Sequence, residues 1–192
     1  TAELLSKTPP AIDALIKQSP HHANLFYIPS SLRLMQTLDL LMTRPYRESI
    51  LKKQLARVKG FDAIIIDTQP NAQIGTVNAM VAATHFLIPI DGGFSLDGLA
   101  DLMMLIDEYR AGDPYTKHIF KSKFSAAKKV MGRFIDDSLA PYADDVLTSV
   151  VRVDEAVEQA NTSANPVRLY RSHARAAADY RELTNELMTR LE

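Results

Sequence analysis

Apolar runs alternate with helix-patterned segments along this chain, and this alternation constrains the fold more than any other feature of the sequence. Residues 63–66 and 86–90 are apolar at every position, which is typical of strands covered on both faces. Strands that alternate with helices form mostly parallel sheets on which the helices pack. The sequence therefore predicts an α/β fold, a single domain over residues 1–192 with a mostly parallel twisted sheet flanked by helices.

The elements follow one another without an internal repeat or a shift in composition. Gly60 is expected at the position just after the end of the second helix, where glycine is favoured. We expect strands at 24–29, 61–70, 84–90, 118–124 and 146–153, and helices at 32–42, 45–59, 75–83, 94–111, 125–140, 154–160 and 173–191.

Composition excludes several classes of protein. The chain has 22 basic and 23 acidic residues and a formal net charge of -1, which excludes a wholly basic nucleic-acid binder but permits a local basic patch. The lack of cysteine excludes thiolate zinc sites, iron–sulfur clusters and thiol catalysis, and the five histidines lack metal-ligand spacing. No apolar run approaches the roughly 20 residues of a membrane span, and the first residues do not resemble a signal peptide. We therefore expect a cytoplasmic protein.

The most informative polar position is Asp67, which follows the apolar residues 63–66. Ligands of open α/β sheets bind at the carboxyl ends of strands. An apolar strand ending in aspartate is the Walker B pattern of nucleotide hydrolases, in which the carboxylate orients Mg²⁺ and its waters. Asp67 is thus the candidate metal residue, acting through water, with Thr68 and Pro70 beside it. The alternative is a strand whose terminal aspartate only caps the next helix.

Residues 61–90 resemble a segment of the ParA-type (Soj/MinD-like) partition ATPases, the deviant-Walker family. That segment has a strand ending IIIDTPP, a small-residue helix containing T-x-N-A, and a strand ending LIP. Thr76, Asn78, Ala79 and Pro89 stand at the corresponding places. Residues 24–34, 93–106, 154–170 and 176–188 resemble further segments of the family in the same order.

The resemblance implies a P-loop NTPase-like fold and a Mg²⁺-dependent ATPase. Such a protein forms a homodimer on binding ATP, binds DNA non-specifically, and segregates plasmid, chromosome or other cargo. It also implies a ParB-like or cargo-adaptor partner, no membrane, and a nucleoid-associated location in the cytoplasm. Asp67, Thr68 and Pro70 would bind nucleotide and magnesium, while Lys123, Phe124, Val151 and Arg152 would line the adenine pocket.

The family's lysine-containing glycine loop and its D-x-D-P-Q segment do not occur in the 192 residues. We therefore expect an N-terminal portion carrying the P-loop strand and helix to be missing from this chain. The ATPase activity is expected on the condition that the full protein has it. The catalytic residue would lie there and stays unknown. The alternative is a degenerate paralogue that rebuilt its sheet.

Residues 117–133 carry six basic side chains and no acid, whereas residues 91–113 are acidic. In an arbitrary protein such a basic run is a solvated face. Given the resemblance, we predict a DNA-binding surface, with a second basic patch before and at the start of the last helix. The candidates are Lys121, Lys123, Lys128, Lys129, Arg133, Arg168, Arg171 and Arg175.

Three other functions compete with the partition ATPase. One is a scaffold that kept the fold but lost nucleotide chemistry. Another is a MinD-like membrane-cycling ATPase, which is disfavoured because the last helix lacks a lysine-rich, bulky apolar face. A dehydrogenase is excluded by the absence of G-x-G-x-x-G.

Overall fold

The computed structural model describes residues 1–69 and 71–191. The chain divides into two compact units: Thr1–Thr84 with Ile106–Pro114, and His85–Leu105 with Tyr115–Glu192. The second unit contains the parallel sheet flanked by helices, so the predicted fold class is confirmed. The assignment of all 192 residues to one domain stays a prediction.

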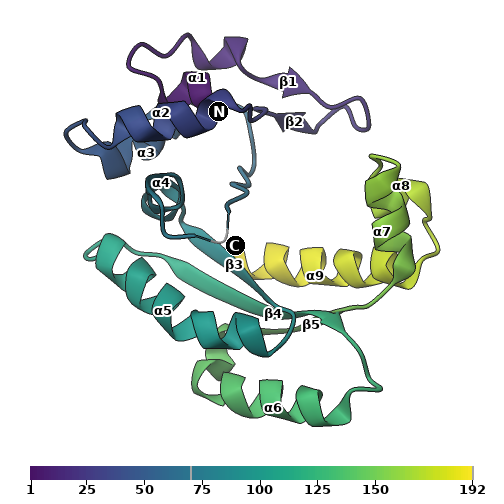
Figure 1. Cartoon of the computed structure of the whole chain (residues 1–192). Coiled ribbons are helices and arrows are strands. Elements are labelled where there is room, and N and C mark those ends of the chain that lie inside the picture. Colours follow the sequence, from purple (N-terminus) through teal and green to yellow (C-terminus); the bar gives the residue numbers. More distant parts are fainter. Residues whose placement is uncertain (70, 192) are drawn as a thin grey trace. The chain divides into compact units, whose positions relative to one another are not determined.

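The sheet of the second unit has the order β3-β4-β5, with β3 at His85–Ile90, β4 at Thr116–Phe124 and β5 at Val146–Arg152. Both pairings are parallel, with Ile88 opposite Ile119 and Ile119 opposite Val146. Helices α5 (Gly93–Tyr109) and α6 (Lys129–Leu139) lie on one side of this sheet, and α9 (Arg175–Leu191) lies on the other (Figure 1).

Alternation along β4 divides the core between the two faces, as the two-residue period of a strand requires. Ile119 packs with the residues of α5 and α6, whereas its neighbour Phe120 packs toward α9. The first cluster comprises Ile88, Ile90, Leu99, Met103, Ile119, Ile135 and Leu139, and the second comprises Phe120, Leu147, Val151 and Leu183.

Acidic side chains fix the helices that follow β5. Asp154 caps α7 (Glu155–Thr162) by accepting a hydrogen bond from the Ala156 amide at 3.0 Å, and it also accepts one from the Ala176 amide of α9 at 2.9 Å. Glu186 of α9 accepts hydrogen bonds from the amides of Thr148 and Ser149 on β5, each at 2.8 Å. These carboxylates satisfy backbone donors that the helix start and the strand leave unpaired.

The first unit is mainly helical. Helices α1 (Ala2–Leu5), α2 (Arg33–Leu41), α3 (Ile50–Leu55) and α4 (Ile74–Ala82) are joined by the 3₁₀ turns η1 (Ile12–Ala14) and η2 (Arg47–Ser49). Strands β1 (Lys17–Gln18) and β2 (Phe26–Tyr27) form an antiparallel pair. The buried core of this unit comprises Leu4, Leu5, Ile12, Leu41, Ile50 and Leu51.

The strand predicted at 61–70 is wrong for the residues that the structure describes. Residues 61–69 form no strand, because none of the described residues pairs with them in a ladder. Ile64 and Ile65 are accordingly 50% and 94% exposed, while Ile66 packs against the core of the first unit.

Two predicted helices also need correction, and one helix was not predicted. The second predicted helix is shorter: it ends at Leu55, and Gly60, with φ of 80°, is not its C-terminal cap. Helix α6 begins at Lys129 rather than 125, because residues 125–128 form a turn closed by the Lys128 amide and the Ser125 carbonyl. The short α8 (Val167–Tyr170) was not predicted. Within the described part, no helix is long and apolar enough to cross a membrane.

Candidate functional site

Asp67 and Thr68 are exposed in the segment between α3 and α4. Neither side chain makes a hydrogen bond or ion pair with another of the described residues, so the carboxylate and hydroxyl oxygens are available to a ligand. Pro70, the third residue of the predicted set, lies outside the described residues. The described residues contain no group of three or more His, Cys, Asp or Glu that would hold a metal ion.

The T-x-N-A motif fixes the turn and the helix that follow Asp67. The Thr76 hydroxyl lies 3.3 Å from the Gln69 carbonyl oxygen and 3.2 Å from Asn71 Oδ1, which ties the start of α4 to this turn. Asn78 is fully buried. Its Nδ2 donates to the Arg47 and Ile74 carbonyls, each at 2.8 Å, and its Oδ1 accepts from the Leu51 amide at 3.0 Å. The motif thus joins α4 to η2 and α3.

Asn78 therefore has a structural role, because its hydrogen bonds join three elements of the first unit. The sequence did not predict this role. A side-chain amide offers two donors and one acceptor, and all three are used here. A buried amide with every partner satisfied specifies the local structure, whereas an unsatisfied one would destabilise it.

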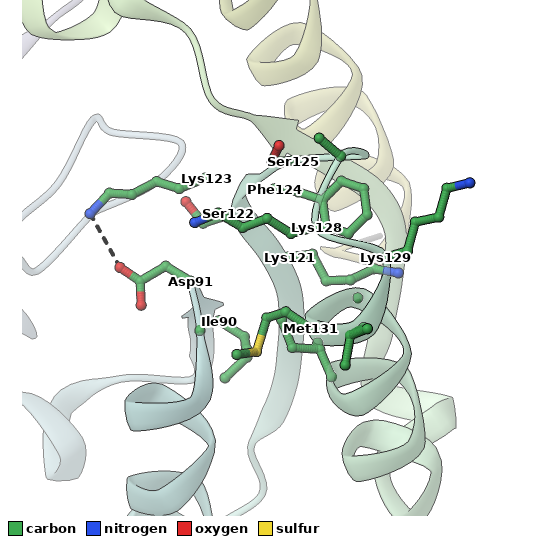
Figure 2. Close-up of a pocket in the computed structure, with 15 residues that line it drawn as sticks. Ile90, Asp91, Lys121, Ser122, Lys123, Phe124, Ser125, Lys128, Lys129 and Met131 are labelled. Carbon is green, nitrogen blue, oxygen red and sulfur yellow. Dashed lines mark hydrogen bonds and ion pairs between the residues drawn. The ribbon is translucent and has the colours of Figure 1, made fainter.

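A cavity of about 550 Å³ lies at the carboxyl ends of β3 and β4 (Figure 2). Asp91 follows β3, residues 121–124 end β4, and the start of α6 completes the wall. Lys123 Nζ lies 3.2 Å from Asp91 Oδ2, so an ion pair joins the ends of the two strands. Lys121 Nζ lies 2.8 Å from Asp136 Oδ1 and 5.6 Å from the centre of the Phe124 ring.

Two of the four residues predicted for the adenine pocket line this cavity. Lys123 and Phe124 line it, and Lys123 adopts a φ of 50°, which is uncommon for a residue other than glycine. Val151 is buried in the core beneath α9 instead. The Arg152 guanidinium is bound to Asp179. Contact of these four residues with a nucleotide base stays a prediction.

The basic run of residues 117–133 divides into paired and unpaired side chains. Lys117, Lys121 and Lys123 form ion pairs with Asp145, Asp136 and Asp91. Lys128, Lys129 and Arg133 are exposed, and their side chains have no such partner among the described residues. These three are therefore the cations of the run that are available to an external anion.

The three arginines of the second predicted patch have different surroundings in the structure. Arg175 Nη2 donates to the Val153 carbonyl at 2.5 Å and so has a structural role. Arg171 is exposed. Arg168 instead lines a smaller cavity together with Arg181 of α9, a residue that the sequence reasoning did not select. Only the short, unpredicted helix α8 brings Arg168 close to that cavity, so no signal in the sequence pointed to this pair.

Comparison with known proteins relates this architecture to one family. The family model described as an AAA domain, AAA_31, matches residues 2–119. The chain is 28% identical over 184 residues to the chromosome-partitioning ATPase Soj of Treponema pallidum, covering 93% of this chain and 72% of that protein. It is 27% identical over 169 residues to the sporulation initiation inhibitor protein Soj of Bacillus subtilis, covering 85% and 67%. The chain belongs to the AAA-domain family of ParA-type partition ATPases.

Solved structures agree with the fold of this family. Cobyrinic acid a,c-diamide synthase of Mycobacterium smegmatis matches with a TM-score of 0.75 and 20% identity, over 100% of this chain and 72% of that chain. The structure of the same enzyme with a bound ATP analog and magnesium matches with a TM-score of 0.66 and 20% identity, over 85% and 73%. At 20% sequence identity, this likeness shows the fold of this chain and nothing about its activity.

Proposed function

We propose that this protein is an ATP-dependent partition ATPase that dimerises on binding ATP, binds DNA non-specifically in that state, and positions plasmid, chromosome or other cargo. A ParB-like or cargo-adaptor protein would stimulate hydrolysis, and DNA binding would place the protein on the nucleoid. Membership of the family supports the ATPase class. The single observation that carries the DNA-binding part is that Lys128, Lys129 and Arg133, at the start of α6, are exposed and have no side-chain partner among the described residues.

Asp67 and Thr68 fit a magnesium nucleotide by their chemistry. Mg²⁺ in nucleotide sites keeps several waters and is held by one or two carboxylates together with the substrate's phosphates. An exposed carboxylate without a side-chain partner among the described residues suits that arrangement. When bound, the ion would neutralise charge on the phosphates. Asp67 would orient its water shell, and Thr68 would add a hydroxyl oxygen.

Within the second unit, the cavity at the ends of β3 and β4 is our candidate for the adenine pocket. Its volume of about 550 Å³ lies within the roughly 300–1,000 Å³ of small-molecule sites. The Phe124 ring would offer an apolar face, and the Lys123–Asp91 pair would hold the loop in place. Val151 and Arg152 would contribute through backbone atoms, because the side chain of one is buried and that of the other is bound to Asp179.

DNA binding by α6 would rest on phosphate contacts, which do not depend on base sequence. Replacing Lys128, Lys129 and Arg133 by Gln removes three cations that hold no internal partner, so folding should be little affected. Each lost phosphate contact lowers the log–log salt slope by roughly 0.9 in duplex DNA. A dimer presents the surface twice, so the losses compound.

The test measures anisotropy of a labelled random-sequence duplex across a salt titration, with and without ATP and magnesium, using protein expressed from its native reading frame. The matched control replaces Lys7, Lys59 and Arg33 by Gln, since these are also exposed and change the net charge equally. We expect ATP-dependent binding that the α6 variant loses and the control keeps. Equal DNA affinity and equal salt slope for both variants would show that the three α6 residues do not bind DNA. Arg168, Arg171 and Arg175 would then remain as candidates. Failure of both patches would favour a scaffold without DNA binding.

A further inference from the structure

A second, smaller cavity of about 230 Å³ lies between α8 and α9. Its floor is apolar: Ala177 is buried, and Val167 packs against the alanine cluster of Ala156, Ala174 and Ala177. Its remaining wall is polar and includes Tyr180, Thr184 and Asn185. The apolar residues of the cavity are therefore fixed by packing, whereas its polar residues are exposed.

Two guanidinium groups from different helices line this cavity. Arg168 comes from α8 and Arg181 from α9. Neither side chain has a hydrogen bond or ion pair with another described residue, and no Asp or Glu lines the cavity. The other two arginines of α9 differ, because Arg175 donates to Val153 and Arg190 donates to the carbonyls of Asp144 and Val146. The cavity is thus electropositive, with donors that the fold itself does not use.

The volume of the cavity and its apolar residues favour some anions over others. At about 230 Å³ the cavity is smaller than the roughly 300–1,000 Å³ of typical small-molecule sites, so it is small for a whole nucleotide. A single oxyanion fits, and guanidinium groups bind carboxylate and phosphate oxygens in planar, charge-assisted pairs. The apolar floor of Val167 and Ala177 additionally favours an anion that carries a short aliphatic stem. A glutamate side chain has such a stem, whereas a DNA phosphate does not.

We propose that the Arg168–Arg181 cavity is an anchor site for an acidic side chain, preferably glutamate, of a protein partner. The carboxylate would lie between the two guanidinium groups, with the Asn185 amide and the Tyr180 hydroxyl as further donors. Its methylene groups would cover Val167 and Ala177. Arg168 is also one of the DNA-binding candidates, so the test must separate a carboxylate from a phosphate.

The test is a series of ¹⁵N-NMR titrations of the full chain at constant ionic strength. Three probes are compared: the capped peptide acetyl-Ala-Glu-Ala-amide, its uncharged match acetyl-Ala-Gln-Ala-amide, and inorganic phosphate. We expect the Glu peptide to give saturable shifts confined to residues 167–168, 177 and 180–185, the Gln peptide to give none, and phosphate to bind more weakly. Arg168→Gln and Arg181→Gln should each lower the affinity for the Glu peptide about three- to tenfold.

Arg33→Gln is the matched control and should leave the titration unchanged, since Arg33 is exposed, lies outside the cavity and has no side-chain partner among the described residues. The variants' spectra away from the cavity report whether the fold is intact. Equal shifts from the Glu and Gln peptides, or no saturable shifts, would overturn the proposal. Phosphate binding at the same residues as tightly as the Glu peptide would also overturn it, because the cavity would then be a phosphate site. None of these outcomes depends on ATP hydrolysis.

Discussion

The buried carboxylate of Asp179 holds both the backbone and the side chain of Arg152 at the carboxyl end of β5. Asp179 Oδ2 accepts hydrogen bonds from the Arg152 amide and from Nε, each at 2.9 Å, and Oδ1 accepts one from Nη2. Asp179 is 2% exposed, whereas the Arg152 side chain is about half exposed. The contact therefore fixes α9 against the end of β5.

Asp179→Asn should destabilise the protein by about 1–3 kcal/mol, because an amide keeps the size of the carboxylate but loses the charge-assisted bonds to Arg152. Chemical denaturation of the variant and the parent measures this difference. Asp137→Asn is the control, since Asp137 is exposed on α6 and has no partner among the described residues; it should change stability by less than about 0.5 kcal/mol. Equal stability of the parent and Asp179→Asn would contradict the assigned role.

Acid should destabilise the protein through the same contacts. The hydrogen bond from Arg152 lowers the pKa of Asp179, and the backbone hydrogen bonds of Ala176 and Ala156 lower the pKa of Asp154. The unfolded chain then binds protons first, so the stabilisation is complete above the ordinary carboxyl pKa of about 4 and is lost as the pH falls through the lower folded values. Melting temperatures should fall below about pH 4, and Asp179→Asn should show a shallower fall. If the melting temperature of Asp179→Asn fell with pH as steeply as that of the parent, this account would be contradicted.

Ala164→Gly should stabilise the protein. Ala164 follows Ser163, the C-cap of α7, and has a φ of 51°. Its amide donates to the Asn161 carbonyl, and the Asn165 amide donates to the Ala160 carbonyl. A side chain in this left-handed conformation costs about 1–2 kcal/mol, while glycine loses more entropy on folding, so a net gain of roughly 0.5–1 kcal/mol is expected. Ala126→Gly, in the exposed turn before α6, is the control and should not stabilise. A lower melting temperature for Ala164→Gly would show that the strain is absent.

The order of strands and helices was predictable because it depends on local periodicity. The runs at 84–90, 118–124 and 146–153 are each within two residues of a strand in the structure. Residues 61–69 show the limit of such reasoning. Their apolar pattern is typical of a strand, yet a strand also needs a neighbour with which to pair, and no described residue supplies one.

The candidate sites were predictable only as residue types. Basic residues 128, 129 and 133 are exposed as expected, but the ion pairs of Lys121 and Lys123 join residues 15 and 32 positions apart. The Arg152–Asp179 contact spans 27 positions, and the Arg168–Arg181 cavity depends on a four-residue helix. Such pairings are set by tertiary packing, to which a local pattern gives no access.

The rate of magnesium-dependent ATP hydrolysis is the most direct measure of the proposed function, with protein expressed from its native reading frame. Asp62 lies in the same segment as Asp67 and is also exposed, so Asp62→Asn is the matched control for Asp67→Asn. We expect hydrolysis by the parent and by Asp62→Asn at rates within about twofold of each other, and a loss of at least about tenfold in Asp67→Asn, which corresponds to about 1.4 kcal/mol of transition-state stabilisation. Retention of the parent rate by Asp67→Asn, or the absence of hydrolysis in the parent, would contradict the account.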